Sequence, residues 1–391
     1  MPLLNSAQEM FDEVKSWRQE LHRNPELLFD VFKTAAFVER KLKDFGCDEV
    51  VTGLGRTGVV GVIHGRHGPG PAIGLRADMD ALPIHEMTGR PYASTVDGVM
   101  HACGHDGHTA MLLGAARHLC ETRNFRGRVV VIFQPAEEGG GGGLAMMKDG
   151  LAERFAIDRF YALHNLPGLP IGHFATRKGG LQAAMDVFTI TITGSGGHAA
   201  APHTTIDPIL IGAQIVTALQ SIASRNANPV ESVVVSVTQF QAGDTHNVIP
   251  DTAKLTGTIR SLKRELRDLA LANLKRTAEG IATALGGRAE VTDGGILPYP
   301  VTFNHTRETS VIAEAARRVA GAQSVDDDCQ PDMGAEDFAF MLEARPGAMI
   351  NMGNGNSAPL HNAQYDFSDE AIPHGVSFWV SLAEMELAPD K

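Results

Sequence analysis

The stretch Met100–Thr109, which reads MHACGHDGHT, places three histidines, one cysteine and one aspartate within ten residues. Its two glycines allow tight turns, and Met111, Leu112 and Leu119 follow it at helical spacing. We therefore expect a loop at a helix start, where several donor groups can converge. Thiolate and imidazole suit Zn²⁺, and imidazole also binds Mn, Co and Ni. The alternative is a flexible polar loop that contains a buried free cysteine.

A second group of charged residues follows a probable central strand of a sheet. Arg128–Gln134 is a nearly continuous apolar run, which is typical of a strand buried on both faces. Glu137 and Glu138 follow Pro135 and Ala136, and five glycines come after them. Adjacent glutamates usually form a solvated pair. Here the strand end and the glycine run, which permits close backbone approach, favour a site.

The same arrangement recurs at other strand ends. Asp78 and Asp80 follow a strand that begins at Ala72, although a solvated turn would read the same way. His164 ends the apolar strand Phe160–Asn165, and His361 follows a later strand and loop. A lone histidine there is more often structural. Repetition favours function, because open α/β sheets bind ligands at the carboxyl ends of their strands.

The middle of the chain has a different pattern, which predicts a separate inserted domain. The order of its elements is βαββαβ, typical of a ferredoxin-like unit, and Asp207-Pro208 is a good helix start. We predict an α/β protein with a mixed-sheet catalytic domain, covered by helices on both faces, over residues 1–184 and 297–391. The inserted domain is predicted over residues 185–296.

Composition excludes several classes of function. The formal net charge of −12 argues against nucleic acid and anionic membranes as partners, since both require a basic face. The four dispersed cysteines predict no disulfide framework and fit a cytoplasmic protein, and neither a secretory signal nor a spanning helix is expected. Gly53–Gly58 matches GxGxxG, but the β-like run Val59–Ile63 follows it, so we interpret it as a turn rather than a dinucleotide site.

These strand-end residues together suggest a two-metal site. Two cations about 3.5–4 Å apart can activate one water molecule and bind a carbonyl oxygen. Such a site needs about five protein ligands and a general base that does not bind metal. The candidate residues are Asp80, Cys103, His105, Glu137, Glu138, His164 and His361.

Five motifs across nearly the whole chain resemble those of the N-acyl-amino-acid amidohydrolases. That family includes the hippurate hydrolases and the indole-acetyl-amino-acid hydrolases. It belongs to the dinuclear metallopeptidases, with aminoacylase and glutamate carboxypeptidase. The motifs are Leu75–Pro83, His101–His108, Gln134–Gly139, Gly196–Ala200 and Gly334–Phe338.

The resemblance implies a role for each of ten residues. It implies that two divalent ions per subunit (Mn²⁺, Zn²⁺, Co²⁺ or Ni²⁺) are held by Cys103, His105, Glu138, His164 and His361. Glu137 would be the general base and Asp80 would orient a ligand. The inserted domain would form a lid and a homodimer or homotetramer interface, from which His198 reaches the partner's active site and stabilises the oxyanion. Asn247 and Arg260 would contact the substrate.

We therefore expect a metal-dependent amidohydrolase that cleaves a small N-acyl amino acid into a carboxylic acid and a free amino acid. The alternative within the same chemistry is a dipeptidase or a carboxypeptidase. A metal-dependent binding protein without turnover is a further alternative, and a nicotinamide oxidoreductase would rest on Gly53–Gly58 alone.

Overall fold

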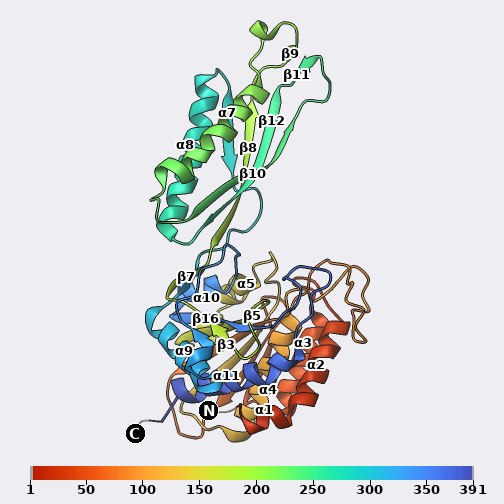
Figure 1. The fold of residues 1–391 in the computed structure, drawn as a ribbon, viewed down its shortest axis with the longest axis vertical. Coiled ribbons are helices and arrows are strands. Elements are labelled where there is room, and N and C mark those ends of the chain that lie inside the picture. The colour runs from red at the N-terminus through yellow and green to blue at the C-terminus, as the bar shows by residue number, and fades with distance from the viewer. Residues whose placement is uncertain (1–2, 390–391) are drawn as a thin grey trace. The chain divides into compact units, whose positions relative to one another are not determined.

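The computed structural model describes residues 3–389 and separates the chain into two compact units (Figure 1). The sheet unit comprises Met1–Leu181, Phe303–Gln330 and Asp337–Lys391. The inserted unit comprises Gln182–Thr302 together with Pro331–Glu336. This last segment joins the inserted unit because the Ala183 amide donates to the Gly334 carbonyl at 2.9 Å.

An eight-stranded mixed sheet forms the centre of the sheet unit. The strand order is β1-β2-β4-β3-β5-β16-β6-β15, and the four strands β4, β3, β5 and β16 run parallel. Their carboxyl ends therefore meet at one edge of the sheet. The strand bounds are β1 Glu49–Leu54, β2 Gly58–His64, β3 Ala72–Asp78, β4 Arg128–Gln134, β5 Arg159–Leu166, β6 Phe174–Ala175, β15 Val325–Asp326 and β16 Gly347–Gly353.

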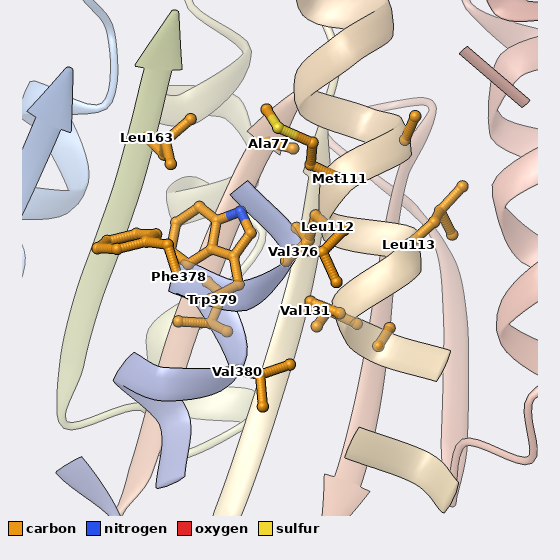
Figure 2. Packing of buried hydrophobic residues seen from close by; sticks show 14 of the residues in the cluster. Ala77, Met111, Leu112, Leu113, Val131, Leu163, Val376, Phe378, Trp379 and Val380 are labelled. Carbon is orange, nitrogen blue, oxygen red and sulfur yellow. The ribbon is translucent and has the colours of Figure 1, made fainter. Parts of the chain in front are cut away.

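Helices cover both faces of this sheet, and two hydrophobic clusters lie beneath them. On the first face, Met111 and Leu112 of one helix and Phe378 and Trp379 of another pack over the sheet strands (Figure 2). The helices of this face are α1 Asn5–Glu9, α2 Phe11–Arg23, α3 Phe32–Asp44, α4 His105–Thr122, α9 Thr306–Ala320 and α11 Ile372–Glu386. The opposite face is covered by α5 Gly142–Lys148, α6 Leu151–Arg154 and α10 Ala339–Ala344.

The inserted unit has the predicted βαββαβ order, with an antiparallel sheet ordered β10-β12-β8-β13. Its elements are β8 Ala184–Thr193, α7 Pro208–Ser221, β10 Val233–Ala242, β12 Thr252–Ser261, α8 Arg264–Ala284 and β13 Arg288–Thr292. The Asp207 carboxylate caps α7 by accepting from the Ile209 amide at 2.8 Å. The predicted α/β class and the ferredoxin-like insertion are therefore confirmed.

The GxGxxG stretch forms a turn between two antiparallel strands. Strand β1 ends at Leu54, β2 begins at Gly58, and these two residues pair with each other. A dinucleotide-binding glycine stretch opens a helix, whereas this one leads into strand β2. The dinucleotide interpretation is therefore excluded. Within residues 3–389, none of the helices has the length and apolar character needed to cross a membrane.

Candidate metal centre

The parallel strands bring three of the predicted sequence segments to one edge of the sheet. Asp78 is the last residue of β3, and Glu137 follows the end of β4 by three residues. His164 is the third residue from the end of β5, and helix α4 begins at His105. The neighbouring order β4-β3-β5 therefore places these segments side by side, although they are far apart in the chain.

The donor atoms of the five expected metal ligands form two overlapping groups. Those of Cys103, His105 and His164 all lie within 4.8 Å of one another, and so do those of Cys103, Glu138 and His361. The Cys103 Sγ atom is 3.4 Å from His164 Nε2, and Glu138 Oε1 is 3.3 Å from His361 Nε2. Because Cys103 belongs to both groups, its sulfur lies within 4.8 Å of donor atoms of His105, His164, Glu138 and His361.

Two of the imidazoles are oriented by backbone carbonyl groups. His105 Nδ1 lies 2.8 Å from the Asp80 carbonyl, and His164 Nδ1 lies 2.6 Å from the Asn165 carbonyl. A carbonyl only accepts, so each Nδ1 carries the proton and donates it. In the neutral imidazole each Nε2 then has a lone pair, which is the form that binds a metal ion.

One buried polar atom in this cluster indicates that a cation fits there. His105 Nε2 is shielded from solvent and has no hydrogen-bond partner. Leaving such an atom unsatisfied is costly, and a divalent cation would satisfy it. Thiolate, imidazole and carboxylate donors together suit Zn²⁺ and its neighbours.

The pKa of His361 is also shifted by its neighbours in the cluster. Hydrogen bonding to Cys103 and Glu138 raises the pKa of His361 to about 10. Groups that can carry negative charge therefore face this imidazole. The residue has a left-handed backbone (φ 62°), and its amide donates to the Ala102 carbonyl at 2.8 Å, so the chain at His361 is tied to the Cys103 loop.

Asp80 organises the two glutamates through their backbone. Its carboxylate accepts from the Glu137 amide at 2.9 Å and from the Glu138 amide at 3.1 Å. Burial raises the pKa of Asp80. The turn continues into a crowded glycine run, where a Cβ atom on Gly142 would collide with the Pro135 carbonyl oxygen. This close approach explains the glycine at position 142.

A buried network beneath the cluster was not predicted from the sequence. Arg76 donates to Asp78 at 2.7 Å and to Asp337 at 3.0 Å, and all three side chains are buried. His108 Nδ1 donates to the other oxygen of Asp78 at 2.7 Å, while His108 Nε2 accepts from the Asn165 amide at 2.9 Å. Both ring nitrogens of His108 are thus engaged by protein groups beneath the cluster.

Charges in this network control the ionisation of Asp78. Burial alone would raise the pKa of Asp78, but His105 and Arg76 hold it well below its ordinary value. Two sequence signals could have found the network. Asp337 lies in one of the five motifs but was assigned no role, and His108 follows His105 at a spacing that shares a helix face.

The three remaining candidates lie in the inserted unit. His198 is exposed in β9 (Gly197–His198), which pairs with β11 (Val248–Ile249), and the Ala199 amide donates to the Asn247 carbonyl at 3.0 Å. His198 Nδ1 accepts from the Ala200 amide at 3.0 Å, so Nε2 carries the proton and can donate a hydrogen bond.

Arg260 lies away from His198 and Asn247 within this unit. It is the ninth residue of β12, about 25 Å along the strand from the end that adjoins β11. Its guanidinium donates to the Ile259 carbonyl at 3.1 Å, and burial lowers its pKa. The inserted unit therefore brings together His198 and Asn247 but not Arg260.

Comparison with known proteins supports the chemistry of this centre. The model of the Peptidase family M20/M25/M40 matches residues 74–385. The chain is 40% identical to the hippurate hydrolase of Campylobacter jejuni over 98% of this chain and 99% of that protein. It is 39% identical to an N-acetylcysteine deacetylase of Bacillus subtilis, covering 95% of this chain and 96% of the relative.

A similar solved structure is the YXEP protein of Bacillus subtilis, described as a dinuclear metal binding peptidase from the M20 family. The TM-score is 0.85 and the identity 36%, with 98% of this chain and 100% of that chain covered. Both the fold and the capacity for two metal ions are thus found together in a relative.

Proposed function

The chain belongs to Peptidase family M20/M25/M40, and from this premise we propose that it hydrolyses the amide bond of N-acyl amino acids. The products are a carboxylic acid and a free amino acid. The observation that supports this most directly is the convergence of one thiol, three imidazoles and one carboxylate at the sheet edge, with Glu137 beside them. Hippurate-like conjugates are the proposed substrates, because the relative named hippurate hydrolase aligns over almost the full length of the chain.

Five residues would hold two divalent cations, with Mn²⁺, Zn²⁺, Co²⁺ and Ni²⁺ as candidates: Cys103, His105, Glu138, His164 and His361. When bound, such ions activate a water molecule and polarise the scissile carbonyl. The thiolate of Cys103 must remain reduced for this role, which fits a cytoplasmic location.

Glu137 acts as the general base and then as the general acid. Its side chain is buried, with 7% exposed, and its carboxylate lies within 4.8 Å of the donor atoms of His105 and Glu138. The carboxylate takes one proton from the attacking water, whose oxygen forms the new bond to the carbonyl carbon. It then gives that proton to the amide nitrogen as the C–N bond breaks. Asp80 keeps Glu137 in place through its backbone amide.

The inserted unit contributes groups that contact the substrate. His198 can donate from Nε2 to the oxyanion that forms on the carbonyl oxygen. Asn247 and Arg260 bind polar groups of the substrate, and the guanidinium suits the carboxylate of the amino acid. The separation of Arg260 from His198 within one unit supports the proposal that His198 acts in the partner's active site.

A homodimer or homotetramer through the inserted unit completes this arrangement, with His198 acting in the partner's active site. Strand β10 lies at an edge of its sheet, so its outer backbone groups are available for pairing. Its side chains Val234 and Phe240 are 37% and 41% exposed. A second copy that pairs with this edge would cover them.

The test combines metal analysis with a substrate panel. The purified protein should contain about two divalent cations per chain, lose activity with a chelator, and regain it when metal is returned. Hippurate, N-acetyl amino acids and indole-acetyl conjugates should be cleaved faster than dipeptides. Faster cleavage of dipeptides or of carboxyl-terminal residues would identify a peptidase instead. Metal binding without cleavage of any panel member would indicate a binding protein.

A further inference from the structure

Two cysteines that the proposed chemistry does not use lie in contact within the sheet unit. The Sγ atoms of Cys47 and Cys120 are 3.5 Å apart. Cys47 lies in the loop between α3 and β1, and Cys120 lies in the last turn of α4. A disulfide needs the sulfurs at about 2.05 Å, so they must approach by about 1.5 Å. The loop position of Cys47 allows such a movement.

Arg123 holds the two cysteine-bearing segments together. This residue follows Cys120 by three positions, just after the end of α4. Its guanidinium donates to the Gly46 carbonyl at 2.9 Å and to the Asp48 carboxylate at 2.6 Å. Those residues flank Cys47 on both sides, so contacts independent of the thiols keep the two segments adjacent.

We propose that Cys47 and Cys120 form an intramolecular disulfide when the protein meets a peroxide. The pair is then a modification site that is separate from the metal centre. Helix α4 connects the two regions, but Cys120 is fifteen residues beyond His105. At 1.5 Å per residue this separation is about 22 Å along the helix axis.

The reaction begins at Cys120. Its thiolate attacks one oxygen of hydrogen peroxide, the O–O bond breaks, and a sulfenic acid forms while the released hydroxide becomes water with the proton that left the thiol. Cys47 Sγ then attacks the Cys120 sulfur. The S–O bond breaks, and the departing hydroxide leaves as water with the Cys47 proton. Two thiols have lost two electrons, and one peroxide has become two waters.

The surroundings favour this order of events. A hydrogen bond from Cys47, together with the charge of Arg123, lowers the pKa of the Cys120 thiol. The same sulfur–sulfur contact and burial raise the pKa of Cys47. Cys120 is 7% exposed, which admits a molecule the size of peroxide more readily than a bulky oxidant.

The cross-link would constrain much of the sheet unit. It joins residues 73 positions apart, and the enclosed segment includes Cys103 and His105. Closing a loop of this length restricts the unfolded chain and stabilises the folded one, by an amount that depends on strain in the bond. We expect the apparent unfolding temperature to rise by about 5 °C or more.

The experiment uses the full-length, metal-loaded protein, treated with hydrogen peroxide and then blocked, digested and mapped by mass spectrometry. The expected product is one peptide pair that links Cys47 to Cys120 and that dithiothreitol separates. Cys329, whose pKa burial raises to about 11, serves as an internal control and should remain outside any disulfide.

Two variants separate the cross-link from other oxidation. Cys47→Ser and Cys120→Ala should both lack the linked peptides and the rise in unfolding temperature. Any oxidation of Cys103 affects the wild type and these variants alike, so the difference between them isolates the pair. Folded wild-type protein in which Cys47 and Cys120 stay as thiols, oxidise separately, or link only between chains would overturn the proposal.

Discussion

The candidate metal centre of the sheet unit and the proposed substrate-contacting residues of the inserted unit are built in different ways. In the sheet unit, Cys103 and His164 are 6% and 8% exposed, and backbone carbonyls fix the imidazoles. In the inserted unit, His198 is exposed on a two-residue strand. Most of the groups proposed to hold ions are thus buried, whereas His198, which is proposed to meet the substrate, lies at the surface.

The pKa values of buried histidines near the candidate metal centre are strongly shifted. Near the metal centre, burial and the neighbouring His108 lower the pKa of His164 to about 3, and burial lowers that of His101 to about 4. Strongly shifted groups collected at one place are typical of an active site, although structural networks shift pKa values as well.

Four predictions test whether buried groups of the sheet unit and exposed groups of the inserted unit differ in role. They are given in order of decreasing effect.

The largest effect is expected at the general base. Glu137→Gln removes the proton acceptor and should lower kcat by about 10²–10⁴-fold, while metal content stays at the wild-type level. Steady-state kinetics and elemental analysis on the same sample measure both quantities. The matched control is Glu138→Gln, which should lose metal together with activity. A Glu137→Gln enzyme with near-normal kcat would remove the proposed role.

The next effect concerns the free energy of unfolding, to which the buried network around Arg76 contributes. Arg76→Met leaves the carboxylates of Asp78 and Asp337 buried without their shared cation, which should lower the free energy of unfolding by about 3–5 kcal/mol. Denaturant titration of the metal-free protein measures it. Arg317→Met, at an exposed pair with Asp327, should cost only about 0–1 kcal/mol. Equal losses in the two variants would contradict the importance of the buried network.

An effect on turnover alone is expected in the inserted unit. His198→Ala should lower kcat by about 10²–10³-fold, as expected for loss of an oxyanion donor. Because the side chain is exposed, metal content and the free energy of unfolding should remain within error. The neighbouring exposed residue provides the control, since His203→Ala should leave kcat unchanged. If His198→Ala lost metal, the distinction between the two units would fail.

The smallest effect is a pH dependence of stability that belongs to the sheet unit. His22 is fully buried, and although burial opposes the charge, Asp106 raises the pKa of His22 to about 9 from 6.5. The folded protein therefore holds this proton more tightly than the unfolded chain. The resulting stabilisation, about 3 kcal/mol, is fully present below pH 6.5 and is lost as pH rises through about 9.

Denaturant titrations of wild type and His22→Gln at about pH 6 and about pH 9.5 measure this contribution. The loss of stability between these two values should be about 3 kcal/mol larger in the wild type. His85→Gln, at an exposed pair with Asp97, is the control and should behave as the wild type does. Identical pH profiles for wild type and His22→Gln would contradict the link to Asp106.

Much of the frame could be predicted because its signals are local. The apolar run of β4 and the alternation in β8 follow from which faces of each strand are buried. The turn at Gly53–Gly58 followed from the strand after it. The strand-end positions of Glu137 and His164 likewise predicted that both lie at one edge of the sheet. The support beneath that edge could not be predicted in this way, because Arg76 reaches Gln134 and Asp337 from 58 and 261 residues away.

The sequence by itself determined which donor groups exist and that they follow strands. Residue chemistry and the alternation of buried and exposed positions depend only on residues close together in the chain. Only the tertiary structure decided that β3 lies between β4 and β5, which brings Asp78, Glu138 and His164 to one edge. It also decided that Cys103 belongs to both donor groups and that both ring nitrogens of His108 contact protein groups. The physical reason is that strand order and hydrogen-bond partners depend on contacts between distant segments, which no local pattern specifies.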